Sequence, residues 1–179
     1  MGKNIFRINL IVIIFLMLTA LNGWSQSVNS KLSIIKFNVS KFGFSNVDGT
    51  FKGMSGTVIF NENNPSASSF NVCVDATTVL TDEDDRTEHL KQKDFFYVKK
   101  YPNICFKSTS IIKTANGYSV TGNLTIKGKT LPATIPFTYK NNVFNGKFKV
   151  NRKKYNLVDG TKQFLIGDIV DVIIICTVQ

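Results

Sequence analysis

Thr81 to Ser108 reads TDEDDRTEHLKQKDFFYVKKYPNICFKS, a charged stretch followed by an aromatic one, and it interrupts a chain that otherwise alternates like β-strands. Asp82 is expected to cap a short helix, because its carboxylate can accept the unpaired backbone N–H groups of the first turn. Arg86, His89 and Leu90 are three and four residues apart, so they share one helix face. A proline then prevents further helix before strand-like residues resume. The segment therefore predicts a single helical lid on a β structure.

The regions on either side of this segment alternate between apolar and polar residues with period two, which is typical of half-buried β-strands. Turn-forming pairs separate the apolar runs, at Asp48-Gly49, Asn116-Gly117, Lys127-Gly128 and Asn141-Asn142. Many strands joined by short turns predict a mainly β fold, an antiparallel β-barrel of about eight strands with one short helical insertion. A barrel of that size is wide enough to hold one ligand.

The last predicted strand, Ile169 to Val178, is apolar on both faces. A strand of this kind is usually covered on the outside as well as the inside. We expect the cover to be either the first residues of the mature chain or a partner subunit in a homodimer.

Three motifs of the chain resemble the YceI-like family, whose members are secreted or periplasmic lipocalin-like barrels that bind polyisoprenoid lipids. The resemblance extends from about Ile35 to the C-terminus and implies a lipocalin-like barrel with a lipid ligand and no cofactor. The motifs that carry it are Phe37 to Val39 with Gly43-Phe44-Ser45, then Arg86, His89-Leu90, Asp94-Phe95-Phe96, Tyr101-Pro102 and Phe106-Lys107-Ser108, and finally Gly122 to Ile126 with Gly128.

The abundance of phenylalanine, 15 residues in the whole chain, suits a cavity but does not require one. Rigid rings can line a tunnel around a long ligand, or they can simply fill the barrel. The resemblance favours the tunnel. The residues predicted to line it are Phe37, Val39, Phe44, Phe51, Phe60, Phe95, Phe96, Phe106, Leu124 and Ile126.

A second set of predicted site residues is polar and would either bind a ligand headgroup or tether the helix: Lys41, Arg86, His89, Asp94, Lys127 and Arg152. Arg86 is expected to pair with Asp94, because arginine grips a carboxylate with two hydrogen bonds and keeps donors for a phosphate or quinone oxygen. Lys41 and Lys127 stand where the family commonly has histidine. They favour an anionic headgroup such as a pyrophosphate, unless both are surface substitutions.

Catalysis is not predicted, because the chain has one histidine and that residue lies next to an arginine. No catalytic residue and no metal site are expected, since His89 and the neighbouring acids lack the second histidine or cysteine that zinc usually requires. The main prediction is therefore binding of a long-chain isoprenoid or related amphipathic lipid, for carriage, storage or sequestration. One alternative is an interaction protein with a filled barrel, and another is a hydrolase that uses His89.

Residues 1–25 read as a secretory signal peptide, with Lys3 and Arg7 before an apolar run that is too short to span a membrane. Residues 26–179 then form the predicted lipid-binding domain of a periplasmic or secreted protein. A retained N-terminal anchor is the alternative. Of the three cysteines, Cys73 and Cys105 could form a disulfide, but the expectation from the sequence is three free strand cysteines.

Positive charge is concentrated in the C-terminal half, where residues 95–179 hold 13 Lys and Arg against 3 Asp and Glu. Such a surface could contact anionic lipid headgroups of a membrane, or it could serve solubility alone. A nucleic-acid partner is not expected, because the chain reads as exported and has no recognisable nucleic-acid module.

Overall fold

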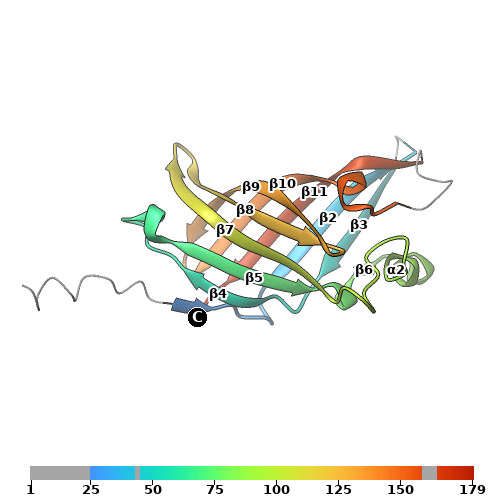
Figure 1. Cartoon of the computed structure of the whole chain (residues 1–179), viewed down its shortest axis with the longest axis horizontal. Coiled ribbons are helices and arrows are strands. Elements are labelled where there is room, and N and C mark those ends of the chain that lie inside the picture. The colour runs from blue at the N-terminus through green and yellow to red at the C-terminus, as the bar shows by residue number, and fades with distance from the viewer. Residues whose placement is uncertain (1–24, 43–44, 159–164) are drawn as a thin grey trace, which may run out of the picture.

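The chain forms one strongly curled sheet with a short helix at one end, as the computed structural model describes it for residues 25–42, 45–158 and 165–179 (Figure 1). Among these residues α2, Asp84–Leu90, is the one α-helix, and three short 3-10 helices are η1, Pro65–Ala67, η2, Ala76–Thr78, and η3, Arg152–Tyr155. The strands are β1, Ser25–Ser27, β2, Ile34–Lys41, β3, Ser45–Phe51, β4, Ser55–Ile59, β5, Ser69–Asp75, β6, Leu80–Thr81, β7, Asn103–Thr114, β8, Gly117–Ile126, β9, Lys129–Lys140, β10, Val143–Asn151, and β11, Ile166–Thr177.

All eleven strands belong to one antiparallel sheet in the order β1-β4-β5-β7-β8-β9-β10-β11-β2-β3-β6. The sheet curls into a half-barrel, so the predicted mainly β antiparallel fold with one short helix is confirmed. The sheet has more strands than the eight or so expected, in part because β1 and β6, of three and two residues, extend its two edges. Between β5 and β7, which are neighbours in the sheet, the chain forms the edge strand β6 beside β3 and then α2.

The first strand links one edge of the sheet to the end of β11. Ser25 pairs with Ile59 of β4, and Val28 bridges to Val178 just beyond β11. The amide of Ser27 also donates to the carbonyl of Gln179 at 3.1 Å. These bonds tie β4 to the C-terminal end of β11 and hold the curl at that end of the half-barrel.

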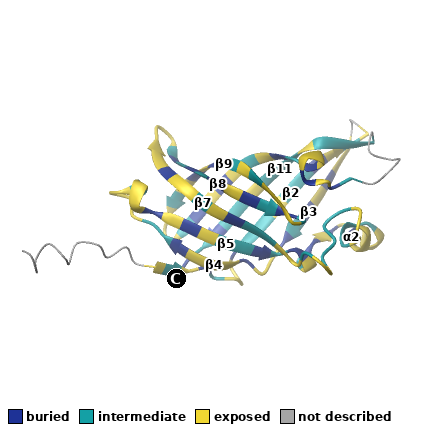
Figure 2. Ribbon diagram, in the orientation of Figure 1, coloured by how far each residue is buried: buried dark blue, intermediate teal, exposed yellow. Residues whose placement is uncertain are grey.

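Burial follows the predicted alternation, with dark buried and yellow exposed residues taking turns along the strands in Figure 2. On β8, Tyr118, Val120, Leu124 and Ile126 are buried. The opposite face carries hydroxyl pairs between strands, such as Thr121 with a threonine of β9 at 3.0 Å. One face of each central strand therefore lines the interior while the other contacts water.

The turns at Lys127-Gly128 and Asn141-Asn142 are confirmed, and all four residues have positive φ, the backbone form that suits two-residue hairpins. The predicted turn at Asp48-Gly49 is wrong, because both residues lie inside β3. Gly49 is opposite Phe37 of β2, and a Cβ atom at this position would lie 2.1 Å from the Phe37 ring. The glycine is there to make room for that ring and not to form a turn.

Helix α2 begins one residue later than predicted. Glu83 holds the N-cap position with no capping side-chain bond, and Asp82 pairs with Arg86 instead. The start of the helix is fixed by two buried hydroxyls, because Thr87 accepts the amide of Thr81 at 2.9 Å and their side chains are 3.0 Å apart. None of the helices in the described part of the chain has both the length and the apolar character needed to cross a membrane.

The outer face of β11 is exposed rather than covered by the N-terminal segment. Ile169 and Ile173 are 45% and 40% exposed, whereas β1 pairs with β4 and meets only the end of β11. The expected cover by the first residues of the mature chain is therefore wrong for this part of the strand. A homodimer through this face stays a prediction.

The expectation of three free cysteines is also wrong. Cys73 on β5 lies directly opposite Cys105 on β7, and the two form a disulfide, which leaves Cys176 as the free thiol. The lid segment separates these strands in the sequence but not in the sheet. The pairing register of β5 on β7 brings the two sulfur atoms together, and this register could not be predicted from the sequence.

Candidate functional site

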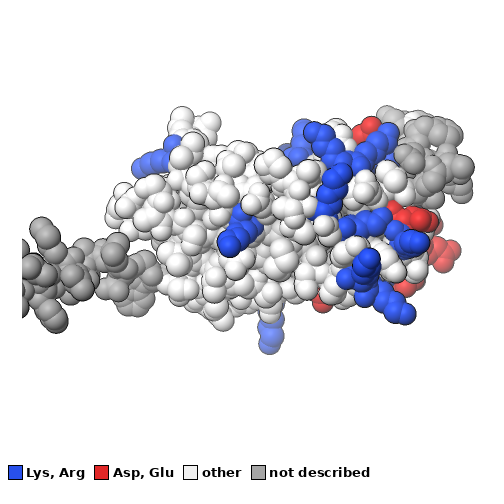
Figure 3. Space-filling model, in the orientation of Figure 1, with Lys and Arg blue, Asp and Glu red and all other residues white. Residues whose placement is uncertain are grey.

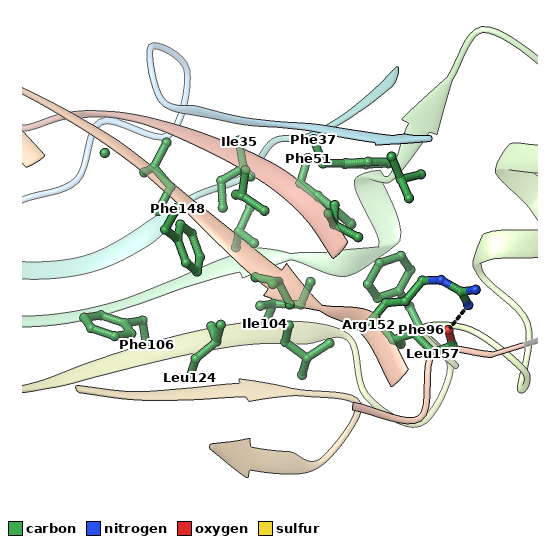
Figure 4. A pocket seen from close by; sticks show the side chains of 18 of the residues that line it. Ile35, Phe37, Phe51, Phe96, Ile104, Phe106, Leu124, Phe148, Arg152 and Leu157 are labelled. Carbon is green, nitrogen blue, oxygen red and sulfur yellow. Dashed lines mark hydrogen bonds between the residues drawn. The ribbon is translucent and has the colours of Figure 1, made fainter. Parts of the chain in front are cut away.

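The half-barrel encloses an apolar cavity of about 530 Å³, a size common for small-ligand sites. Its wall is built from the inward faces of the strands and from the lid between β6 and β7 (Figure 4). On β11 the wall runs from Ile166 to Cys176, a length of roughly 33 Å at the usual rise per residue. The cavity is therefore elongated and follows the strand direction.

Eight of the ten residues predicted to line a tunnel lie on this wall: Phe37, Val39, Phe51, Phe95, Phe96, Phe106, Leu124 and Ile126. Phe44 lies outside the described residues. The placement of Phe60 was wrong, because its ring packs at the far end of the half-barrel against Tyr118, Tyr139 and Phe144, with ring centres 5.0–5.2 Å apart. Aromatic rings thus fill one end of the interior and line the rest.

The helix face that was predicted to carry Arg86, His89 and Leu90 lines the cavity. Arg86, His89 and Leu90 of α2 all line the wall, as their spacing implied. Phe96 packs edge-on to Phe51 of β3 with ring centres 5.2 Å apart, and Phe95 packs on the ring of His89 at 5.0 Å. The lid therefore covers part of this end of the cavity with aromatic side chains and presents two nitrogen-bearing groups beside them.

The predicted pairing of Arg86 with Asp94 is wrong. Arg86 donates to Asp82 at 2.6 Å and to Glu83, both on its own segment. Spacings of three and four residues make these carboxylates the nearest partners, so the guanidinium is held by local ion pairs. Asp94 is exposed and is not part of the cavity wall.

Lys127 is not on the wall either, but it holds the lid in place. Its Nζ donates to the carbonyl of Asp94 at 3.2 Å and to that of Asn156 at 2.7 Å. The Asp94 carbonyl also accepts the amide of Val158 at 3.1 Å. Burial lowers the pKa of Lys127, and the nearby Asp94 carboxylate partly opposes that shift. This lysine joins the lid, the β8–β9 turn and the loop after β10.

Arg152 is the most buried charged residue at this end, with 5% of its surface exposed, and it lines the cavity. Its guanidinium donates to the carbonyls of Leu157, Ile166 and Gly167 at 2.8–2.9 Å (Figure 4 shows the Leu157 bond). Burial lowers its pKa, and Asp168, 3.9 Å away, opposes the shift. The side chain ties Leu157, just after η3, to the start of β11 and keeps positive charge beside the wall.

The charged residues on the described part of the wall are all basic. Lys41, Arg86 and Arg152 line the cavity together with His89, while no Asp or Glu is among the described lining residues. These basic groups come from the end of β2, from α2 and from η3, so they gather at the lid end of the cavity. An elongated apolar cavity with positive charge at one end suits an amphipathic ligand whose headgroup accepts hydrogen bonds.

Chemistry beyond binding has little support in the described residues. The free thiol of Cys176 lies on the wall, but burial raises its pKa to about 11, so it stays protonated at neutral pH. His89 contacts an aromatic ring, and among described residues no group of three or more His, Cys, Asp or Glu could hold a metal ion.

Several lining residues were missed by the sequence reasoning. Strand alternation could have revealed Ile35, Ile104 and Phe148, whereas Val170, Val172 and Ile174 lie on β11. The inner face of β11 was hidden because that strand is apolar on both faces. Leu157, which lies in the loop after β10, has no periodic signal at all.

The curled antiparallel sheet, its apolar cavity and the lid at one end define a binding protein of lipocalin-like build. The chain belongs to the YceI-like family, since residues 26–178 match the YceI-like domain. It is 34% identical to protein YceI of Escherichia coli over 135 residues, which is 70% of this chain and 71% of the relative.

Solved structures show the same architecture. The crystal structure of BcnA from Burkholderia cenocepacia has a TM-score of 0.76 at 28% identity, covering 85% of this chain and 99% of BcnA. A polyisoprenoid binding domain from Saccharophagus degradans has a TM-score of 0.65, covering 86% of this chain and 97% of that domain. The sequence identity to that domain is 13%, so the likeness shows a shared fold alone.

Proposed function

We infer that this protein binds a long-chain isoprenoid, or a related amphipathic lipid, inside the cavity and carries, stores or sequesters it. The observation that carries the proposal is the elongated apolar cavity with basic groups at its lid end. Membership of the YceI-like family and the fold shared with a polyisoprenoid binding domain support it. No catalytic step is required.

Burial of the hydrocarbon would drive binding, at roughly 0.8 kcal/mol per CH₂ transferred from water. The wall is made largely of aliphatic and aromatic side chains, so it offers an apolar surface to a hydrocarbon chain along β11. The cavity also argues against the filled barrel of the alternative interaction protein, although the Phe60 end is packed.

The basic end favours a ligand whose headgroup is anionic. Lys41 and Arg86 line the wall next to the buried Arg152, and no acid lines it among described residues. A pyrophosphate can accept several hydrogen bonds from such groups, whereas a neutral alcohol accepts few. Lys127 takes no direct part in this proposal, because backbone carbonyls of the lid and of the loop after β10 occupy its Nζ.

We place this function in the periplasm or outside the cell. The basic and apolar pattern of residues 1–25 supports export. The Cys73–Cys105 disulfide is also typical of proteins that fold in an oxidising compartment.

The first experiment is native mass spectrometry of the protein purified from its exported form, followed by organic extraction of whatever is released. A prenyl lipid present at close to one per chain would support the proposal and identify the headgroup. If extraction yields nothing and added prenyl lipids fail to bind, the proposed function is refuted.

A variant pair then tests the headgroup. Lys41→Ala should weaken binding of a prenyl pyrophosphate and spare the matching prenyl alcohol. Lys36→Ala is the matched control, because Lys36 is on the same strand but exposed and away from the cavity wall. Equal losses for both ligands in Lys41→Ala would contradict a preference for anionic headgroups.

A further inference from the structure

We propose that the lid end of the half-barrel docks on an anionic membrane surface through a basic arc of six lysines, Lys99, Lys100, Lys127, Lys129, Lys153 and Lys154. The choice of a membrane as the occupant rests on the proposed function, because a lipid cargo must be exchanged with a bilayer. The docking itself depends on the charge of the surface and does not require a ligand in the cavity.

The topology of the sheet brings these lysines together. Lys99 and Lys100 precede β7, Lys127 and Lys129 flank the turn between β8 and β9, and the remaining two lie in η3 after β10. Strands β7, β8 and β9 are consecutive neighbours that stay paired to their lid-side ends. Strand β10 pairs with β9 only from Val143 to Gly146, and the bond from Lys127 to Asn156 joins η3 to the same end. Lysines that are scattered along the sequence therefore follow a single rim.

Contacts between the three loops show that they touch. Lys127 donates to the carbonyl of Asn156, next to η3, and to that of Asp94 in the lid. Gly128 packs so closely on the ring of Tyr101 that a Cβ atom there would lie 2.6 Å from it. Lys100 lies over the same ring, 5.2 Å from its centre.

The arc borders the end where the cavity reaches the surface. Lys41 and Phe42, at the end of β2, both line the cavity, and Phe42 is 48% exposed. An apolar ring at an opening that is bordered by lysines is the combination that binds at a lipid interface, where the ring enters the headgroup region and the charges meet phosphates.

Charge is distributed unevenly around this end, and Figure 3 shows Lys and Arg gathered over it with the acidic side chains to one side. The acids of α2 belong to a helix that packs on β6, an edge strand that is separated from β10 by three strands in the sheet order. Within the arc, Lys153 pairs with Asp168 at 2.8 Å, and Asp94 is exposed nearby. The remaining lysines leave a clear positive excess, which suits phosphatidylglycerol or a similar anionic lipid.

The test is flotation with vesicles of phosphatidylcholine, alone or mixed with phosphatidylglycerol, using one lysine from each loop. The triple variant Lys100→Ala, Lys129→Ala and Lys154→Ala should bind anionic vesicles roughly a hundredfold more weakly, at about fivefold per lysine. The matched control replaces three exposed lysines elsewhere, Lys113, Lys140 and Lys147, and should bind like the unaltered protein. Added salt should weaken binding of the unaltered protein.

Replacing the three arc lysines with arginine should restore binding, which separates charge from misfolding. The vesicles contain no prenyl lipid, so this experiment does not depend on the cavity ligand. Val172→Trp, placed on the cavity wall, should lose ligand and still float with anionic vesicles.

Three results would overturn the docking proposal while leaving the cavity ligand untouched. They are no preference for anionic vesicles, equal losses in the two triple variants, and release from anionic vesicles by inorganic phosphate but not by sodium chloride at the same ionic strength. The last would show a site for free phosphate and not for a bilayer.

Discussion

Blocking the cavity at its midpoint is the sharpest test of whether the interior binds a long chain. Val172 lies on the inner face of β11, opposite Phe148 of β10 and Phe37 of β2, and all three line the wall. In Val172→Trp the indole would occupy space that a ligand needs and would shorten the usable cavity. Ile173→Trp is the matched control, because Ile173 is the next residue, 40% exposed on the outer face.

The expected loss follows from the hydrocarbon left in water. Excluding one isoprene unit costs roughly 4 kcal/mol for its five carbons, which is roughly a thousandfold in affinity. Isothermal titration with a prenyl ligand measures that loss, and thermal unfolding checks that overpacking has cost no more than about 1–3 kcal/mol of stability. If Val172→Trp binds as tightly as Ile173→Trp while both remain folded, the ligand does not occupy this cavity.

Three further predictions concern stability and the lid. Removing the disulfide in the double variant Cys73→Ala, Cys105→Ala should lower the free energy of unfolding, measured in urea, by roughly 3–4 kcal/mol. The reason is that the disulfide closes a loop with a sequence separation of 32. The pKa of the Cys176 thiol is about 11 in the folded protein against an ordinary 9.0. This difference should add roughly 2–3 kcal/mol to the free energy of unfolding, fully present below pH 9.0 and lost as the pH rises through about 11. Lys127→Met should destabilise the protein by roughly 1–3 kcal/mol and speed ligand release, because two carbonyls lose their donor.

Each of these predictions has a control. Reduction of the unaltered protein should match the double cysteine variant, and an unchanged urea midpoint would contradict the disulfide estimate. Cys176→Ala should lack the alkaline loss, so an equal loss in both proteins would assign it to other groups. Lys129→Met removes the same charge two residues away, and equal release rates in the two methionine variants would exclude a role of Lys127 in holding the lid.

The sequence predicted best the features that depend on near neighbours. The shared face of Arg86, His89 and Leu90 follows from helical spacing alone, and all three line the cavity. The alternation along β8 likewise assigned Leu124 and Ile126 correctly to the interior. Both signals need only the geometry of one element.

Features that depend on two segments far apart in the chain could not be predicted from the sequence. The bridge between Cys73 and Cys105 needs the register of β5 on β7, and local composition carries no such information. Arg152 is held by backbone carbonyls, which any residue provides, so no pattern of side chains could identify its partners. Phe60 has the same alternation as the cavity residues, and only the packing at the far end separates it from them.

The Cys73–Cys105 disulfide between β5 and β7 allows the lid sequence to change independently of the sheet. It joins the strand from which the lid segment departs to the strand on which it returns, so residues 76–102, which include the edge strand β6, lie within one covalently closed loop. One proteolytic cut within that loop leaves both fragments linked as a single molecule. The loop is therefore a replaceable module, and grafting a relative's lid between the two cysteines should change cargo preference while the host sheet keeps its register.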